Sequence, residues 1–353
     1  MRSRDLKEVI RVHLKSGSGK NELGSIFIEG HPGIGKSEIV TTVAREENAE
    51  CIDFRLLLRD PSDLLGIPYP DLENGTAKWL VPSELPVVGN HKMGDTGILF
   101  FDDMTTAPPL VQAAAYQLTL TPHRIGEAQL KEGWVIVAAG NMAGTKSLVH
   151  DMPRPLANRF TSHIKLEVNL DDWVGWAVEH KINASIVAFM HSSIAHTAEG
   201  HLLFNFDPKK VEKAFPSPRT WTKASRIMEE TFSTSVRNEL LTGCIGAGAA
   251  AQFSTFERLF EKIPDVKEIL DNGNFDITPK GTGAPDLKYA MVVAVAHGAS
   301  TKKRVDNAIK WATECLEPEF GVLLVKIIGV KNDLIIHSKT LKDWITKNKE
   351  VWA

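Results

Sequence analysis

Residues 30–37 read Gly-His-Pro-Gly-Ile-Gly-Lys-Ser and form a complete G-x-x-x-x-G-K-[ST] loop. The apolar run at 25–29 precedes this loop and a segment of helical character follows it, so the local order is strand, glycine-rich turn and helix. A turn of this kind holds a helix N-terminus against a strand end, where several backbone N–H groups converge on one anion. The sequence therefore predicts a loop that binds a nucleoside triphosphate, in preference to a glycine-rich turn with a chance lysine.

Each residue type in this loop has its own expected task. Glycines remove the Cβ atoms that would block the phosphates, while Lys36 would reach the β- and γ-phosphates as a point charge. The hydroxyl of Ser37 would complete the coordination of a Mg²⁺ ion that keeps most of its waters. The residues that we expect to bind ATP are Gly30, Pro32, Gly33, Ile34, Gly35, Lys36, Ser37 and Glu38.

Polar residues also follow two later apolar runs. Asp102 and Asp103 end the run that begins at Gly97; the first is expected to join Ser37 in holding Mg²⁺, and the second to polarise the attacking water. Asn141 follows the run at 134–140, and its amide is a candidate sensor that bonds the γ-phosphate and the attacking water. Alone, each is also compatible with an ordinary turn after a strand. After a phosphate-binding loop, they predict a hydrolytic site.

Short apolar runs alternate with helical periods up to residue 167, a pattern that predicts a parallel α/β sheet with helices on both faces. We expect strands at 25–29, 50–55, 97–102, 134–140 and 162–167. Beyond residue 170 helical periodicity dominates, and no strand is predicted. The expected organisation is an α/β nucleotide-binding domain at 1–167, a helical lid at 168–272 and a C-terminal helical extension at 273–353.

Composition limits the classes of function. A net charge of −3 over 353 residues argues against a broadly basic nucleic-acid-binding surface. Three widely spaced cysteines suggest neither a disulfide framework nor a zinc site, and favour a reducing, cytoplasmic setting. No run reaches the length of a membrane span. His191, His196 and His201 do not match a common metal spacing, so we interpret them as ordinary surface or lid residues.

Taken in order, the motifs resemble those of the AAA+ ATPases of the MoxR group. The resemblance covers residues 20–235, and it rests on the phosphate loop, Asp-Leu-Leu-Gly at 63–66, Phe-Asp-Asp-Met-Thr-Thr-Ala-Pro-Pro at 101–109, Ala-Gly-Asn at 139–141 and Leu-Ala-Asn-Arg-Phe at 156–160. It implies an AAA+ P-loop core with a helical lid, and ATP and Mg²⁺ bound between subunits of a homo-oligomeric ring, usually a hexamer. It also implies chaperone-like remodelling of a protein partner, including partners with a von Willebrand factor A domain.

The resemblance further implies roles for two arginines. Arg159 would be an arginine finger donated to the neighbouring subunit's site, and Arg219 would be a second sensor at the start of a lid helix. A charge that stabilises a helix C-terminus is the alternative for Arg159, and Arg154 is a nearby competitor. A hairpin expected at 123–130 and the insert at 60–95 would face the pore or ring surface, or be ordinary surface loops.

One position departs from the pattern of the family. Asp103 stands where the family usually has glutamate, and because aspartate is one methylene shorter, the attacking water could lie further from the base and turnover could be slow. Two rival functions stay open. One is a DNA-dependent AAA+ motor or loader, which the acidic net charge disfavours; the other is an ATP-gated assembly module that hydrolyses weakly.

Overall fold

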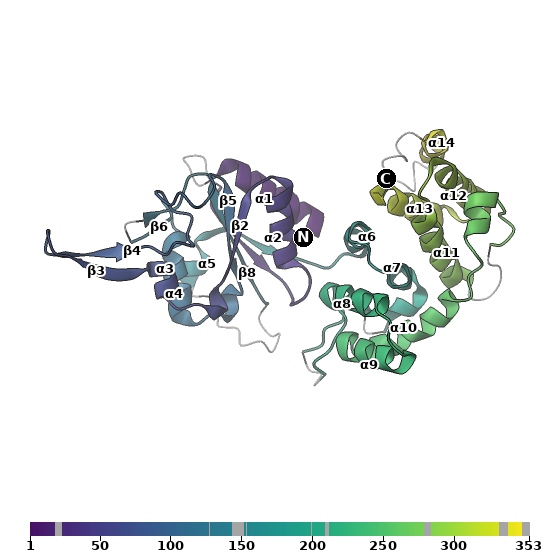
Figure 1. Ribbon diagram of the computed structural model, residues 1–353, viewed down its shortest axis with the longest axis horizontal. Coiled ribbons are helices and arrows are strands. Elements are labelled where there is room, and N and C mark those ends of the chain that lie inside the picture. The colour runs from purple at the N-terminus through teal and green to yellow at the C-terminus, as the bar shows by residue number, and fades with distance from the viewer. Residues whose placement is uncertain are drawn as a thin grey trace. The chain divides into compact units, whose positions relative to one another are not determined.

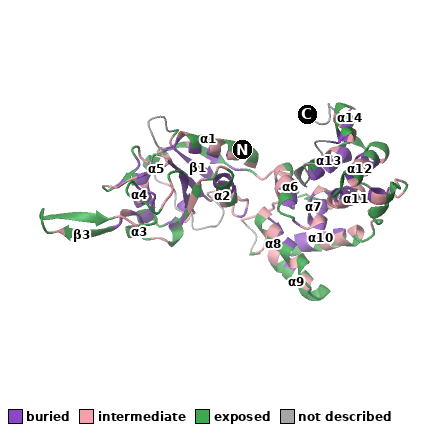
Figure 2. Ribbon diagram, turned by 45° about the horizontal axis from the view of Figure 1, so that its top comes forward, coloured by how far each residue is buried: buried purple, intermediate pink, exposed green. Residues whose placement is uncertain are grey.

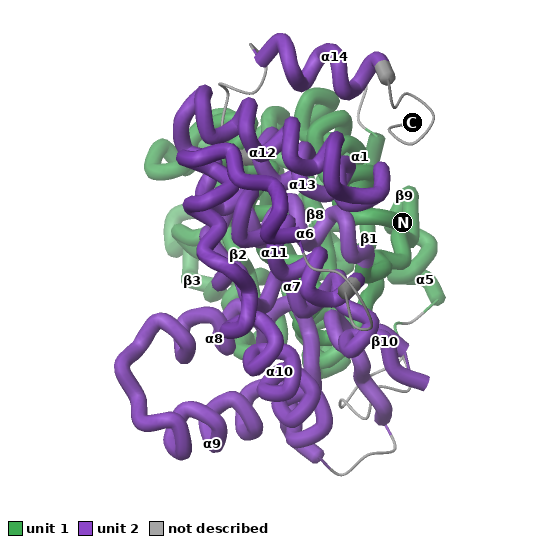
Figure 3. The backbone as a smooth tube through the Cα atoms, turned by 90° about the vertical axis from the view of Figure 1, so that its right-hand side faces the viewer, with its two compact units in different colours: residues 1–168 green, residues 169–353 purple. Residues whose placement is uncertain are grey.

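The computed structural model describes residues 1–17, 23–126, 128–142, 152, 154–198, 200–208, 212–278, 284–331 and 338–347. The chain divides into two compact units, Met1–Val168 and Asn169–Ala353, which are coloured separately in Figure 3. The first unit contains the parallel sheet, and the second is mainly helical (Figure 1). The three-part division drawn from the sequence stays a prediction.

Five parallel strands form the central sheet of the first unit, in the order β2-β5-β8-β1-β9. Strand β1, which leads into the phosphate loop, therefore lies between β8 and β9, and β8 separates it from β5. The strands are β1 (Ser25–Glu29), β2 (Glu50–Arg55), β5 (Gly97–Asp102), β8 (Trp134–Gly140) and β9 (Phe160–Lys165). Four of them have the predicted bounds; β9 begins and ends two residues before the predicted 162–167, because its pairing with β1 starts at Phe160.

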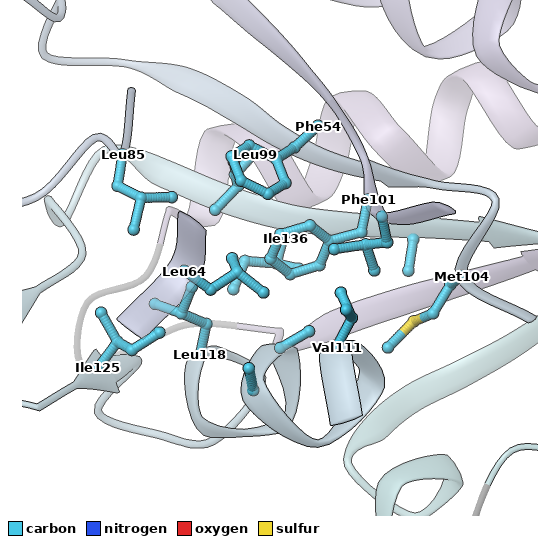
Figure 4. Packing of buried hydrophobic residues seen from close by; sticks show 14 of the residues in the cluster. Phe54, Leu64, Leu85, Leu99, Phe101, Met104, Val111, Leu118, Ile125 and Ile136 are labelled. Carbon is cyan, nitrogen blue, oxygen red and sulfur yellow. The ribbon is translucent and has the colours of Figure 1, made fainter. Parts of the chain in front are cut away.

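Helices cover both faces of this sheet, because successive side chains along each strand point alternately into two hydrophobic clusters. In β5, Phe100 belongs to the first cluster, which one pair of helices covers. Phe101 belongs to the second cluster, on the opposite face of the sheet, which another pair covers. Figure 4 shows the second cluster, where Phe101 lies near Val111 of the covering helix. The predicted fold class is confirmed. The first pair is α1 (Ser3–Ser16) and α2 (Lys36–Glu46), and the second is α3 (Ser62–Leu65) and α4 (Pro109–Leu118).

Two hairpins and several short helical turns complete the first unit. The hairpin β3 (Ile67–Asp71) and β4 (Thr76–Leu80) lies in the insert at 60–95, and its residues are almost all exposed, as Figure 2 shows in green. A smaller hairpin, β6 (Arg124–Ile125) and β7 (Ala128–Gln129), confirms the hairpin predicted at 123–130, of which Glu127 lies outside the described residues. The turns are η1 (Leu56–Leu58), η2 (Met104–Thr106) and α5 (Arg154–Ala157).

The second unit is built from helices. The helices are α6 (Leu170–Glu179), α7 (Ala184–His191), α8 (Pro218–Glu229), α9 (Thr234–Ile245), α10 (Ala247–Phe260), α11 (Ala284–Gly298), α12 (Lys302–Cys315), α13 (Pro318–Lys331) and α14 (Lys339–Lys347), with turns η3 (Ser193–Ala195) and η4 (Glu268–Asn272). Helical periodicity predicts continuous segments at 171–188 and 236–260, and each is divided in the structure. Lys181, at a φ of 55°, follows the end of α6, and Gly246, at a φ of 85°, separates α9 from α10. Among the described residues, no helix has both the length and the apolar character needed to span a bilayer.

A two-stranded ribbon corrects one sequence prediction for this unit. Strands β10 (His196–Thr197) and β11 (Gly200–His201) pair antiparallel, although no strand was expected after residue 170. Each strand has two residues, which is too short to leave a period-two pattern in the sequence. The pairing brings two imidazole rings together, because His196 and His201 are opposite each other with ring centroids 4.6 Å apart.

Among the three histidines interpreted as ordinary surface or lid residues, His191 has an enclosed ring nitrogen. Its ring stacks at 5.9 Å on Tyr289, and its Nε2 atom is closed off from solvent with no hydrogen-bond partner among the described residues. Burial lowers the pKa of His191 from 6.5 to about 4; the nearby Asp171 opposes this shift, and the positive charges of His201, Lys326 and His196 add to it. The folded chain therefore holds a neutral imidazole here.

The free energy of unfolding should fall as the pH drops from about 6.5 toward about 4, because the unfolded chain protonates His191 before the folded chain does. Stability from the neutral ring is fully present above the upper value and is lost through that window. In His191→Phe, which keeps an aromatic ring, the loss across the window should be smaller than in the parent. Urea titrations at half-unit pH steps measure this difference. Equal slopes for the two proteins would contradict a buried neutral His191.

Candidate functional site

The phosphate loop joins β1 to α2 and depends on glycine for two different reasons. Gly33 and Gly35 have φ values of 80° and 99°, in the left-handed region that side chains disfavour. Space does not limit Gly35, since a Cβ there would meet nothing within 4 Å, so its constraint is conformational. At Gly30 a Cβ would lie 2.5 Å from the Cδ1 atom of Ile34, so a side chain there would require the end of Ile34 to move. Gly35 is also the N-cap of α2, so the loop ends at a helix N-terminus.

Lys36 is held across the loop that it follows. Its Nζ atom donates to the carbonyl oxygens of Gly30 at 2.8 Å and His31 at 3.1 Å, and to Oδ1 of Asn141 at 3.1 Å. The bond to Asn141 spans from the first helix after β1 to the end of β8, and it is possible because these two strands are neighbours. The lysine and the candidate sensor predicted from the sequence are thus in direct contact.

The two residues predicted to hold a metal ion are also brought together. Ser37 donates its hydroxyl to Oδ2 of Asp102 at 2.6 Å, across 65 positions of sequence. Asp102 is the last residue of β5 and is buried, whereas Ser37 lies in the first turn of α2. One hydroxyl and one carboxylate suit Mg²⁺, which is commonly bound through one or two protein oxygens, with waters and phosphate oxygens completing its octahedron. Among the described residues, no cluster of three or more histidine, cysteine, aspartate or glutamate residues could hold a metal ion.

Asp103 begins a tight turn beyond the end of β5. It has a φ of 56°, and its N–H donates to Oδ1 of Asp102 at 2.9 Å. Its carbonyl oxygen accepts from the N–H of Thr106 and from that residue's hydroxyl at 2.8 Å, so the turn η2 is closed directly after the carboxylate. A left-handed aspartate at this point is uncommon, and it sets the direction in which the second carboxylate leaves the strand.

Thr105 is a site residue that the sequence reasoning did not identify. Its Oγ1 atom accepts from the backbone N–H of Asn141 at 2.9 Å and donates to the Asn141 carbonyl oxygen at 3.3 Å. Thr105 is buried, and it joins the turn after β5 to the end of β8. The sequence shows only that a hydroxyl residue lies two positions after the acid pair. Its partner, Asn141, cannot be identified until the order of the strands is known.

Basic side chains at this edge of the sheet differ in their charge state. Burial lowers the pKa of His31, and the charges of Lys36 and Lys165 lower it further, so the imidazole favours its neutral form. Arg55 ends β2 opposite Asp102, and its hydrogen bonds to Asp53 raise the pKa of its guanidinium, with Asp102 and Asp103 adding to the effect. Arg55 was not identified from the sequence either, although it is a basic residue at the end of the strand predicted at 50–55.

Arg159 follows α5 and is held by its own chain. Its guanidinium donates to the hydroxyl of Tyr116 on α4, from Nε at 3.1 Å and from the terminal nitrogen at 2.5 Å. The Cζ atom also lies 4.7 Å from the centroid of the Tyr116 ring, within cation–π distance. Arg154, the competing candidate, is exposed at the first position of α5. Arg159 is thus an oriented, partly exposed cation outside the cluster around Lys36.

Arg219 belongs to the second unit. It occupies the first turn of α8, which begins at the N-cap Ser217 with a reciprocal capping box to Thr220. Arg219 is exposed.

The remaining predicted residues of the phosphate loop lie in the first unit. Pro32 and Ile34 are partly exposed, and Glu38 is exposed.

No protein family model and no curated protein matches this chain. Solved structures similar to it include a protein of Cytophaga hutchinsonii described as a candidate ATPase, which is 14% identical with a TM-score of 0.35 over 93% of this chain and 81% of that chain. The RuvB Holliday junction branch migration motor of Thermotoga maritima is 14% identical with a TM-score of 0.39, over 83% and 81%. Hsp104 with ATPγS and casein is 16% identical with a TM-score of 0.34, over 45% and 31%. Similarities this distant carry no argument about function, which depends here on the geometry of the site.

The contact between Arg159 and Tyr116 should be measurable in the isolated chain. A double-mutant cycle with Tyr116→Leu and Arg159→Ala should give a coupling free energy of about 0.5–2 kcal/mol, since it removes a cation–π contact and hydrogen bonds to a charged group. Urea unfolding of the four proteins without nucleotide provides the values. Strictly additive losses would contradict a cis contact between these side chains in solution.

Proposed function

We propose that this chain is a Mg²⁺-dependent ATP hydrolase of the AAA+ type. The observation that carries the proposal is the meeting of Ser37 with Asp102 at 2.6 Å beside the contact of Lys36 with Asn141 at 3.1 Å. A hydroxyl and carboxylate pair for the metal, a lysine for the phosphates and an amide for the terminal phosphate are the parts that phosphoryl transfer requires at one place.

In this proposal each residue acts at a stated atom. The backbone N–H groups around Gly33 and Gly35 and the N-terminus of α2 receive the phosphates, and Nζ of Lys36 exchanges part of its present oxygen partners for phosphate oxygens. Ser37 and Asp102 would hold Mg²⁺, which would neutralise charge on the phosphate oxygens. A carboxylate oxygen of Asp103 accepts a proton from the attacking water, and Asn141 orients that water through its side-chain amide.

The short side chain of Asp103 favours slow hydrolysis. Glutamate would extend one methylene further from the same backbone position, so an aspartate base needs the water closer to the turn. This supports the alternative function, in which ATP binding controls assembly of the chain into an oligomer and hydrolysis is slow. A DNA-dependent motor or loader is disfavoured by the net charge of −3, although a local basic surface would be enough for such a role.

We further propose that the site is completed by a neighbouring copy in a homo-oligomeric ring, on the pattern of the MoxR group and its hexamers. Arg159 supports this because it is oriented and partly exposed yet held outside the cluster around Lys36. In such a ring Arg159 stabilises charge on the transferring phosphoryl group, and Arg219 senses the γ-phosphate from the start of α8. The expected partner is a protein remodelled by the ring, including proteins with a von Willebrand factor A domain, in a cytoplasmic setting that suits three free cysteines.

Lys36→Ala should weaken nucleotide affinity by about 10- to 100-fold, because charge-assisted hydrogen bonds contribute about 1.5–3 kcal/mol each. Binding of a fluorescent ATP analogue with Mg²⁺ measures this effect, with Lys15→Ala on the exposed face of α1 as the matched control. Unchanged affinity in Lys36→Ala would contradict the proposed nucleotide site.

Arg159→Ala should leave nucleotide affinity close to that of the parent and lower kcat by about 10³-fold in the assembled protein, the range for loss of an arginine finger. Particle mass with ATP and Mg²⁺, measured together with the ATPase rate over a range of protein concentrations, separates assembly from catalysis. Arg154→Ala, at the first position of the short helix before Arg159, is measured in parallel because Arg154 is the competing candidate for this role. Full turnover by assembled Arg159→Ala would contradict the role in trans.

A further inference from the structure

We propose that Thr105 is a positioning residue for hydrolysis, which acts by fixing the backbone of Asn141. This inference rests on the proposed function, because Asn141 matters for turnover only if the site hydrolyses ATP. The Thr105 hydroxyl makes two hydrogen bonds to the backbone of Asn141, the residue after β8. It accepts from the Asn141 N–H at 2.9 Å and donates to the Asn141 carbonyl oxygen at 3.3 Å.

The backbone of Asn141 has left the sheet and depends on another partner. The last registered pair between β1 and β8 is Glu29 with Gly140, and the N–H of Gly30 bonds the Gly140 carbonyl oxygen at 3.3 Å. Asn141 is the next residue, where the ladder has ended. Thr105 supplies both a donor and an acceptor at this point, which a hydroxyl can do at once. Its removal leaves both backbone groups without the bonds that hold them.

The methyl group of Thr105 also contributes to this fit. A Cβ placed on Gly140 would lie 2.6 Å from Cγ2 of Thr105 and 2.8 Å from Cζ of Phe27, so only a glycine allows the threonine to come this close. Thr105 is 7% exposed, so solvent has little access to replace its hydroxyl. The end of β8 is therefore enclosed by a side chain that both packs and hydrogen-bonds.

The backbone around Thr105 is also held by hydrogen bonds. Thr105 lies two residues after Asp103, in the turn that the Asp103 carbonyl closes by accepting from the N–H groups of Thr106 and Ala107. The carboxylate proposed as the base and the amide proposed to orient the water are consequently joined through one short turn. Because Oδ1 of Asn141 also accepts from Lys36, a shift of the Asn141 backbone changes the distance between the lysine and the amide.

The test compares Thr105→Val, which keeps the shape and loses the hydroxyl, with Thr105→Ser, which keeps the hydroxyl. The matched control is Thr119→Val, because Thr119 is also a buried threonine of this unit, at 4% exposure. Among the described residues its hydroxyl donates locally, to the Tyr116 carbonyl oxygen at 2.9 Å. We expect Thr105→Val to lower kcat by about tenfold or more, as misplacement of a positioned group does. Its affinity for a fluorescent ATP analogue should stay within about threefold, and Thr105→Ser should recover most of the rate. A kcat for Thr105→Val equal to that of the parent would overturn the proposal.

A second measurement needs no nucleotide. Hydrogen exchange of the Asn141 amide should be faster in Thr105→Val than in the parent or in Thr119→Val, because its acceptor is lost. If Thr105→Val does not fold, Thr105→Ala provides the same comparison with less crowding. Unchanged exchange of the Asn141 amide would overturn the proposal for Thr105, whether or not the parent hydrolyses ATP. Faster exchange in the variant together with an inactive parent would reject the proposed hydrolytic function but not the contact between Thr105 and Asn141.

A double mutant separates positioning from general stability. If Thr105 acts through Asn141, then Thr105→Val should have little further effect on kcat in an Asn141→Ala background, whereas independent structural damage would multiply the two losses. Multiplied losses would overturn the proposal.

Discussion

Parallel pairing of β1, β8 and β5 is the constraint on which the candidate site depends. Parallel strands end at the same edge, so the phosphate loop after β1, the asparagine after β8 and the acid pair after β5 are presented together. The bond from the N–H of Gly30 to the carbonyl of Gly140 extends this alignment one step beyond the strands. The contacts of Lys36 with Asn141, of Ser37 with Asp102 and of Thr105 with Asn141 all lie at that common edge.

The structure connects the proposed catalytic groups through a single stretch of chain. Asp103 opens the turn η2, Thr105 within it bonds Asn141, and Tyr116 on the following helix α4 holds Arg159. The stretch is anchored in the core by Met104 and by the apolar face of α4. A group proposed to act in the same subunit and a group proposed to act in its neighbour are therefore both held by one continuous stretch of chain, from Asp103 to Tyr116.

Local pattern was enough to predict the sheet and the loop, because buried strands and a glycine-rich turn each leave a signal within a few residues. The predicted meeting of Ser37 with Asp102 followed from the Mg²⁺ ion that a phosphate-loop hydroxyl and an acid at a strand end are both expected to hold. Thr105 and Tyr116 could not be found in this way, since each depends on a partner more than thirty residues away in an arrangement set by strand order. The hairpin β3–β4 was missed for another reason: both of its faces are exposed, so no alternation between buried and polar positions marks it.

That hairpin has a consequence for how freely this chain can change. Ile67 and Leu80 are paired directly across the ribbon, so the chain leaves the body of the unit and returns to it at one point. Leu72, near its tip, is 89% exposed, and no strand of the hairpin joins the five-stranded sheet. A two-stranded ribbon of this kind adds little to the stability of what it is attached to. Its length and sequence can therefore vary, by deletion, extension or replacement with another module, while the edge that holds the phosphate loop keeps its shape.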